Sequence, residues 1–245
     1  MKNSARLYQD VARDLRKLIV SEGYAVGDRL ITERQIAEYM KISRGLVRDA
    51  IIMLEVEGIV QVRKGSGIYL MRDPKGEEQP PHDDIGPFEL LQARQLIESA
   101  IAGFAAAMVT KADITRMREA LETERRGIEA KSDDYSGDEA FHRLIAEATQ
   151  NGVLVEMVET LWSKRRQSRM WAQLHDRIFD ESYRRQWLDD HHEILAALQA
   201  RDSARARLAM RQHLTNVSDT LMELSDVGDT AFDGFLFTPA SLPEV

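Results

Sequence analysis

The chain contains no cysteine, and this absence excludes two kinds of structure. Disulfide bonds cannot form, and any transition-metal site must use histidine and carboxylate ligands instead of thiolates. Proline is also scarce, at 6 of 245 residues. No apolar run approaches the roughly 20 residues that a membrane span requires, and the N-terminus has no apolar core of a signal peptide. We therefore expect a cytoplasmic protein with no membrane partner.

Positive charge is scarce overall, because the net charge is −8, but its distribution is uneven. Residues 1–72 hold 13 Lys and Arg against 9 Asp and Glu, a charge of +4. The remainder holds 20 against 32, a charge of −12. A basic segment beside an acidic one suits one domain that faces phosphate and another kept away from it. The distribution permits nucleic-acid binding without establishing it.

The composition changes abruptly at residues 72–85, RDPKGEEQPPHDDI. This stretch is rich in Pro, Gly and acidic residues and lacks apolar periodicity, which is typical of a linker. We predict two domains, a linker and a tail, over residues 1–72, 87–226, 73–86 and 227–245 respectively. The tail carries several apolar residues, so we expect it to pack back on the second domain.

Apolar spacing in the first domain predicts three helices and then two strands, over residues 7–19, 33–39, 44–57, 59–63 and 67–70. Thr32 and Ser43 are the expected N-caps of the second and third helices. The two strands flank a tight KGS turn and should form a hairpin. A helix, a helix-turn-helix and a hairpin together predict a winged helix-turn-helix.

The second domain has heptad-like apolar spacing that predicts only helices, over residues 88–108, 111–128, 134–149, 152–167, 181–200 and 203–224. Asp202 is a plausible N-cap for the last of them. The stretch 169–175, RMWAQLH, is interpreted as irregular. The predicted fold class is therefore mainly α, with a winged helix followed by an all-helical bundle.

The run TERQIAEYMKISRGLVRDAIIMLEVEGIVQVRKGSGIYL, residues 32–70, resembles the winged-helix signature of the GntR family of bacterial regulators. An acid–Arg pair opens one helix, Ser-Arg opens the next, and the wing carries G-x-G. This sequence departs from the family pattern at Gly45, because the family usually has a Thr, with its hydroxyl, at that position. The resemblance implies contacts to operator DNA by Arg34, Ser43, Arg44, Arg48, Lys64 and Gly65.

The position of the expected recognition helix supports this interpretation. Ser43, Arg44 and Arg48 fall in its first two turns, the end that enters the major groove. Because Arg44 and Arg48 are four residues apart, we expect both to project from one face. Gly65 would lie at the wing tip. The alternative is that these basic residues are ordinary solvated side chains.

The run GPFELLQARQLIESAIAGFAA, at the start of the second domain, resembles the all-helical FCD effector domain of the FadR-type GntR subfamily. Further runs, IAEATQN and DDHHEILAALQARD, extend the resemblance to the hexuronate-utilisation repressors of that subfamily. The resemblance implies a regulator of sugar-acid catabolism whose effector is a hexuronate-type carboxylate.

Histidines in the second domain suggest a metal site. Asp138 and His142 are four residues apart, which places both on one face of a helix. His213 has apolar neighbours at helical spacing and should point to the core, and His191 lies on another helix. The resemblance implies that these four residues are metal ligands. An O,N₃ set suits Zn²⁺, which we favour, or Ni²⁺ or Mn²⁺, but not Ca²⁺. The alternative is that each histidine is simply hydrogen-bonded.

Three further residues are candidate ligand contacts. Arg94 and Glu98 are four residues apart in the first effector helix, and the resemblance implies that an arginine here helps hold the ligand. A guanidinium is the natural bidentate partner of a carboxylate. The alternative is a simple intrahelical ion pair. Asn151, in the TQN turn, is expected to add a polar contact.

The leading hypothesis is a homodimeric repressor, not an enzyme, that a sugar acid releases from double-stranded operator DNA. A dimer is expected because one recognition helix reads one half-site. A metal-responsive regulator, with the ion as the signal, is an alternative. A metalloenzyme is a further one, because the Asp/His set could activate water, but the sequence places no separate general base. An apolar-ligand sensor is disfavoured by the charged site.

Overall fold

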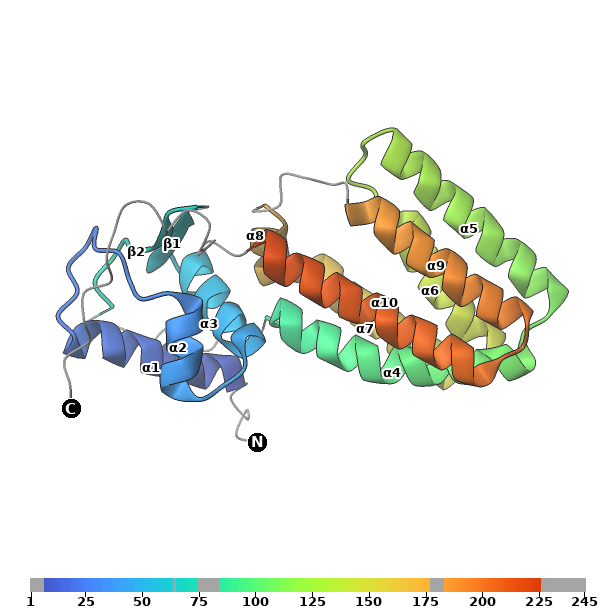
Figure 1. The fold of residues 1–245 in the computed structure, drawn as a ribbon, viewed down its shortest axis with the longest axis horizontal. Helices are drawn as coiled ribbons and strands as arrows, with labels where there is room; N and C mark the ends of the chain where they lie inside the picture. The colour runs from blue at the N-terminus through green and yellow to red at the C-terminus, as the bar shows by residue number, and fades with distance from the viewer. Residues whose placement is uncertain (1–6, 64, 75–83, 177–182, 226–245) are drawn as a thin grey trace. The chain divides into compact units, whose positions relative to one another are not determined.

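A computed structural model describes residues 7–63, 65–74, 84–176 and 183–225 of the chain (Figure 1). The chain divides into two compact units: Met1–His82 and Ser225–Val245 belong to the first, and Asp83–Leu224 to the second. The described residues are mainly helical, and their one sheet has two strands. The predicted fold class is thus confirmed. The predicted tail, residues 227–245, and most of the predicted linker lie outside the described residues.

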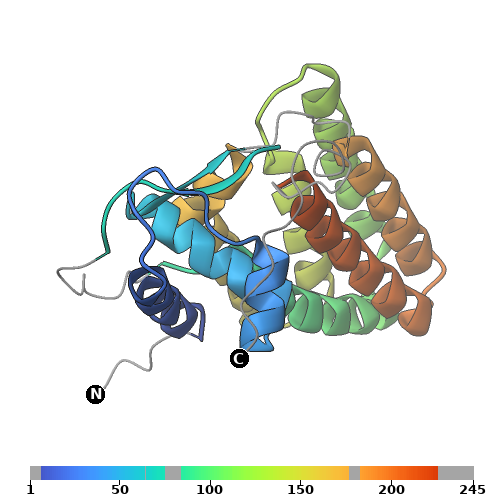
Figure 2. The same ribbon diagram turned by 60° about the vertical axis from the view of Figure 1, so that its left-hand side comes forward.

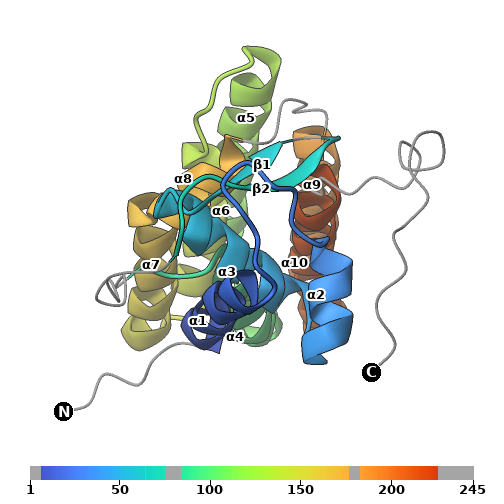
Figure 3. The ribbon, with the colours of Figure 1, turned by 90° about the vertical axis from the view of Figure 1, so that its left-hand side faces the viewer.

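The first unit is a winged helix. Its elements are α1 (Leu7–Ser21), α2 (Glu33–Met40), α3 (Arg44–Val56), β1 (Val60–Arg63) and β2 (Gly67–Leu70). The strands pair antiparallel, with Val60 opposite Leu70 and Arg63 opposite Gly67. The view in Figure 3 faces this unit, where the hairpin lies beside α3.

Side-chain caps fix the helix-turn-helix. Thr32 and Gln35 form a capping box at the start of α2, each side chain bonding the other residue's backbone N–H. The helix ends at Lys41, whose φ of 56° is left-handed. The Ser43 hydroxyl accepts a hydrogen bond from the Leu46 backbone N–H at 3.3 Å and starts α3. Both predicted caps are therefore present.

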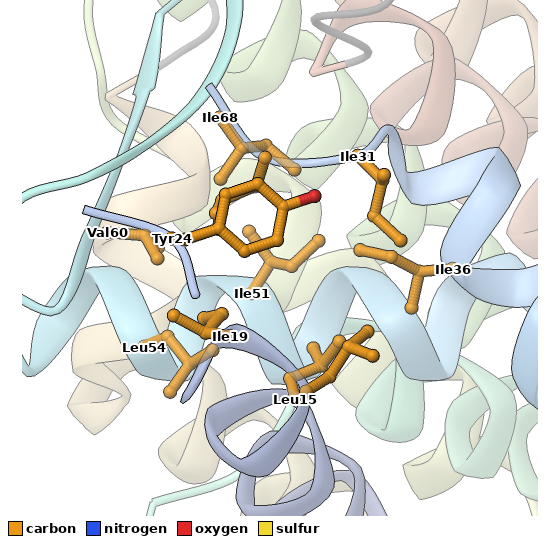
Figure 4. A pocket seen from close by; sticks show the side chains of 11 residues that line it. Leu15, Ile19, Tyr24, Ile31, Ile36, Ile51, Leu54, Val60 and Ile68 are labelled. Atoms are coloured by element: carbon orange, nitrogen blue, oxygen red, sulfur yellow. The ribbon is translucent and has the colours of Figure 1, made fainter. Parts of the chain in front are cut away.

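A small cavity lies in the core of this unit, among side chains from the helices and the hairpin (Figure 4). Its lining is aliphatic apart from Tyr24, and burial raises the pKa of that phenol. The lining includes Leu15, Ile19, Ile36, Ile51, Leu54 and Ile68. Since the lining offers no charged group to a ligand, we assign the cavity to the hydrophobic core.

The second unit consists of helices. They are α4 (Pro87–Met108), α5 (Lys111–Glu129), α6 (Ser136–Ala148), α7 (Gly152–Gln167), α8 (Arg169–His175), α9 (Tyr183–Gln199) and α10 (Ser203–Leu224). The interpretation of residues 169–175 as irregular is wrong, because they form the short helix α8. Its N-cap is Ser168, whose hydroxyl accepts from the Trp171 backbone N–H at 2.9 Å. A serine before an apolar pattern was the signal for it.

Helix α10 packs along α4 and α9, and α5 packs against α6 and α9 (Figures 1 and 2). Asp202 caps α10 by accepting from the Arg205 backbone N–H at 3.0 Å, as expected. The contact between α5 and α6 is made by backbone, since a Cβ on Gly137 would lie 2.8 Å from the Ala120 carbonyl oxygen. The first turn of α6, which carries Asp138, therefore touches α5 directly. No described helix is both long enough and apolar enough to cross a membrane.

Candidate metal centre and nucleic-acid interface

Most of the predicted DNA-binding residues are exposed on the winged helix. Ser43 and Arg44 are exposed at the start of α3, and Gly65 is exposed in the turn of the hairpin with a φ of 69°. Arg34, in the first turn of α2, has 67% of its side chain exposed and lies 3.9 Å from Glu38. Lys64 lies outside the described residues. The exposed guanidinium groups of Arg34 and Arg44 can donate to phosphate or to bases, as the family motif predicts.

Arg48 differs from this group because its side chain is completely buried. It forms a buried ion pair with Glu33, the first residue of α2. The two arginines, which were expected to project from one face, therefore differ in environment: Arg44 is exposed and Arg48 is buried. Four residues advance a helix by about 40° beyond one full turn, and here Arg48 is turned toward α2. Its contact with DNA stays a prediction.

Three histidines from three helices meet inside the second unit. His142 lies on α6, His191 on α9 and His213 on α10, and all three are buried. One ring nitrogen from each lies within 4.8 Å of the other two. The Nε2 atoms of His191 and His213 are 3.1 Å apart. The cluster therefore has the ligand types and spacing to hold a metal ion.

Each histidine also faces a carboxylate through its Nδ1 atom. The pairs are His142 with Glu98, His191 with Glu124 at 2.8 Å, and His213 with Asp190 at 3.4 Å. A carboxylate at Nδ1 favours the tautomer whose lone pair is on Nε2, and it fixes the ring orientation. The Nε2 atom of His142 is buried without a hydrogen-bond partner in the described part of the chain. A bound cation would satisfy that atom.

Asp138 completes the group of predicted ligands. Its Oδ1 atom lies 3.4 Å from His142 Nε2 and 3.7 Å from His191 Nε2. The structure thus brings together the one carboxylate and three imidazoles that the sequence analysis selected, from α6, α9 and α10. Ring nitrogens of the three histidines lie within 4.8 Å of one another, and the Asp138 oxygen lies beside two of these imidazoles, those of His142 and His191.

The electrostatics of the cluster favour charged carboxylates. Burial acts to raise the pKa of Asp138, but His142 and His191 more than offset it, and the pKa is lowered. Burial likewise opposes the effect of Arg94 and His142 on Glu98, yet these lower its pKa to about 2. Burial and the neighbouring His191 lower the pKa of His213 to about 3, although Asp190 opposes this. Burial acts to lower the pKa of His142, but Glu98 and Asp138 more than offset it, and that pKa is raised. Metal binds ionised carboxylates and neutral imidazoles, the states that these shifts favour for Asp138, Glu98 and His213.

Arg94 and Glu98 form a buried pair, with the Arg94 Nε atom donating to Glu98 Oε1 at 2.6 Å. The other Glu98 oxygen is hydrogen-bonded to His142. The pair therefore connects α4 to the histidine cluster, and its predicted contact with the ligand stays a prediction. Asn151 caps α7 by accepting from the Val153 backbone N–H at 3.0 Å. Its predicted ligand contact also remains untested.

Sequence reasoning missed three residues of this region. Glu124 and Asp190 bind imidazoles, and Arg165 lies above aromatic rings on the same side of α7 as Trp162. No sequence signal marked Glu124, which lies 67 residues from its partner His191. For Asp190, the position directly before His191 was visible, but its actual partner is on α10.

The comparisons with known proteins agree with this architecture. Residues 7–70 match the family model of bacterial regulatory proteins of the gntR family, and residues 89–216 match the FCD domain. The Uxu operon regulator of Haemophilus influenzae is 49% identical, over 95% of this chain and 88% of that protein. The Uxu operon transcriptional regulator of Escherichia coli K12 is 47% identical, over 99% and 97% respectively.

The Exu regulon transcriptional regulator of the same E. coli strain is 46% identical, over 95% of this chain and 91% of that protein. These relatives regulate transcription and are not enzymes. The chain therefore belongs to the GntR family of bacterial transcription regulators and carries an FCD domain.

Proposed function

We propose that this protein is a repressor of sugar-acid catabolism that a hexuronate-type carboxylate, bound in the FCD domain beside a divalent metal, releases from its operator. The observation that carries the metal is the convergence of three buried imidazoles, each with a carboxylate at Nδ1. The ligand class is supported by the 46–49% identity to regulators named for the Uxu operon and the Exu regulon.

The residues fit a metal ion of the zinc type. Asp138, His142, His191 and His213 would hold it. The buried Nε2 atom of His142, which faces Asp138 Oδ1 at 3.4 Å and forms no hydrogen bond within the described residues, supports this. Bonds of about 2.1 Å at the tetrahedral angle separate two ligand nitrogens by roughly 3.4 Å, close to the 3.1 Å between His191 and His213. We favour Zn²⁺, with Ni²⁺ or Mn²⁺ as alternatives. When bound, the ion supplies positive charge to a carboxylate or hydroxyl of the ligand.

The winged helix supplies the DNA contacts of this proposal. Arg34, Ser43, Arg44 and Gly65 are exposed where the motif expects them. We infer a homodimer, because one recognition helix reads a single half-site. Release of DNA then requires that the ligand bind more tightly to the conformation with low operator affinity.

Titration of the full-length, zinc-loaded protein tests the ligand. D-Glucuronate, D-galacturonate and D-fructuronate are titrated by calorimetry, with D-glucose as the uncharged control. The operator is a duplex that the protein itself selects from a random pool. We expect one of the acids to bind and to lower the duplex affinity at constant zinc. An affinity that follows zinc concentration and ignores every sugar acid would support the metal-responsive alternative instead.

The DNA-binding surface is tested with Arg44→Ala. We expect loss of specific duplex retention in a gel-shift assay, because a base or phosphate contact worth about 1–3 kcal/mol is removed at each half-site. The thermal shift on adding the sugar acid should be unchanged, since Arg44 is outside the second unit. Arg125→Ala, which removes the same charge from an exposed face of α5, is the control. Unchanged retention by Arg44→Ala would contradict the assignment.

A further inference from the structure

Arg165, on α7, is surrounded by aromatic rings. Its guanidinium carbon lies 4.5 Å from the centre of the Tyr135 ring, 4.9 Å from that of Trp171 and 5.0 Å from that of Trp162. The side chain is half-buried. Within the described ranges, no carboxylate forms an ion pair or a hydrogen bond with it. Its neighbour on the same helix, Arg166, is by contrast paired with Glu139.

Aromatic contacts do not satisfy a guanidinium. A ring attracts the cation through its π face but leaves the N–H groups, five per guanidinium, without acceptors. Removing such a group from water without an acceptor costs free energy, and burial lowers the pKa of Arg165. The planar fork of N–H groups matches the two oxygens of a carboxylate. An anionic ligand is therefore the chemical class that this position would bind.

The surroundings of Arg165 connect it to the metal centre. The Trp162 ring also contacts Arg94, whose guanidinium carbon lies 4.3 Å from the ring centre. The His142 ring lies 5.5 Å from the same indole. Arg94 is already paired with Glu98 at 2.6 Å. Arg165 feels the charge of Asp138 but forms no ion pair with it, so it is the less neutralised of the two arginines.

Polar groups beside Arg165 suit a hydroxylated ligand. The Trp162 Nε1–H group is buried and has no acceptor among the described residues. The Tyr135 hydroxyl is 3.0 Å from both His175 Nε2 and the Tyr183 hydroxyl. An indole donor and a phenol–imidazole network can bind hydroxyl groups, and the faces of Tyr135 and Trp171 can pack on a carbon skeleton.

We propose that Arg165 is the residue that binds the carboxylate of the effector, in a site formed with Tyr135, Trp162 and Trp171 next to the histidine cluster. The ligand class is a hydroxylated carboxylic acid. This inference rests on the proposed function, in which the second unit binds an acid of that class. It transfers the carboxylate contact from Arg94, whose guanidinium is used by Glu98, to Arg165.

Calorimetric titration of the full-length, zinc-loaded protein with D-glucuronate and its neutral amide, D-glucuronamide, tests this. Arg165→Met keeps the aliphatic stem and removes the charge, and Arg165→Lys keeps the charge without the planar fork. Arg166→Met, in an exposed pair one residue away, is the matched control. Zinc content and a tryptophan-fluorescence melt verify that each variant is folded.

We expect the wild type to prefer the acid over the amide. Arg165→Met should bind the acid about ten- to a hundredfold more weakly, since a charged hydrogen-bonded contact is lost. Its affinity for the amide should change much less, so the preference disappears. Arg165→Lys should recover part of the preference for the acid, and Arg166→Met should bind both compounds as the wild type does. An unchanged dissociation constant for the acid in folded Arg165→Met would overturn the inference.

A panel of acids, made up of the three hexuronates, lactate and citrate, separates this inference from the proposed function. If no hexuronate binds but another hydroxy acid, such as lactate or citrate, binds with dependence on Arg165, the inference stands and the hexuronate assignment fails. If a hexuronate binds equally well to Arg165→Met, the assignment stands and the inference fails. A wild-type protein that binds no acid of the panel overturns both.

Discussion

Gly137→Ala is expected to disturb the second unit more than any other single methyl group added at a described glycine of its helices. Gly137 lies in the first turn of α6, against α5. A Cβ there would lie 2.8 Å from both the Ala120 carbonyl oxygen and the Glu124 Cα, and closer still to the Glu124 backbone nitrogen. All three obstacles are backbone atoms, so no side-chain rotation can relieve the overlap. One helix must move away from the other.

The cost follows from this geometry. Overpacking by one methyl group costs typically 1–3 kcal/mol, and a rigid backbone contact places this change near the upper end, at about 3 kcal/mol. For a unit of about 140 residues, each kcal/mol shifts the unfolding temperature by roughly 2–4 °C, which gives a fall of about 6–12 °C. Glu124 contacts His191 at 2.8 Å. Displacement of α5 should therefore also weaken zinc binding.

The assay follows tryptophan fluorescence during thermal unfolding of the full-length protein. All 3 tryptophans, Trp162, Trp171 and Trp187, lie in the second unit, so the signal reports that unit alone. Gly127→Ala, on the neighbouring helix α5, is the control, since its Cβ would be 3.6 Å from the Asp134 carbonyl oxygen, an ordinary contact. It should be neutral or stabilising by up to about 1 kcal/mol. A Gly137→Ala midpoint within about 2 °C of wild type would refute the reasoning.

Three further changes test other parts of the molecule. Glu33→Gln removes the carboxylate charge that faces the buried Arg48 guanidinium and should destabilise the first unit by about 3 kcal/mol, measured by urea unfolding followed by circular dichroism; an unchanged midpoint would contradict this. Glu124→Gln removes a carboxylate from the histidine cluster and should weaken zinc binding about 10–100-fold in competition with a chelating dye, whereas the exposed Glu129→Gln should not. Burial acts to raise the pKa of Asp113, but hydrogen bonds from Thr110 and Arg116 lower that pKa below 3.8. The ionised carboxylate therefore stabilises the fold above pH 3.8, and this stabilisation is lost as the pH falls through the lowered pKa. Asp113→Asn should therefore lose less stability on acidification than wild type, and equal losses would contradict the assignment.

Local signals explain why most of the fold could be predicted. Thr32 and Ser43 cap helices because their side chains accept a hydrogen bond from the backbone N–H three residues later, and such positions are visible in a sequence. The helices of the second unit have regular apolar spacing, and few prolines interrupt it. The helix α8 is not predicted by periodicity because seven residues give too short a window, and its cap Ser168 is the one local signal that marks it.

Part of the histidine cluster was predictable for a similar reason. Asp138 and His142 are four residues apart on one helix, and the apolar neighbours of His213 indicate a buried face. The environment of Arg48 was not predictable, because its partner Glu33 lies 15 residues earlier and the distance between them depends on how α2 packs on α3. Sequence spacing gives the direction of a side chain on its own helix, but not the charge that meets it.

The same limit explains Arg165, and it also bears on how a ligand can act. In the sequence, Lys164, Arg165 and Arg166 form one basic run at the C-terminal end of α7, where the helix dipole favours cations. The structure gives each a different environment, and only Arg165 lies within the aromatic group beside His142. Arg165 and Arg94 both contact the ring of Trp162. Arg94 is in turn paired with Glu98, and Glu98 is hydrogen-bonded to His142. Since Arg94 and Glu98 belong to α4, the first helix after the segment that joins the two units, a ligand at Arg165 can change the balance of charges on the helix that is covalently nearest to the winged helix. A ligand shifts a conformational equilibrium only through different contacts in its two states, and this chain of contacts is where such a difference can arise.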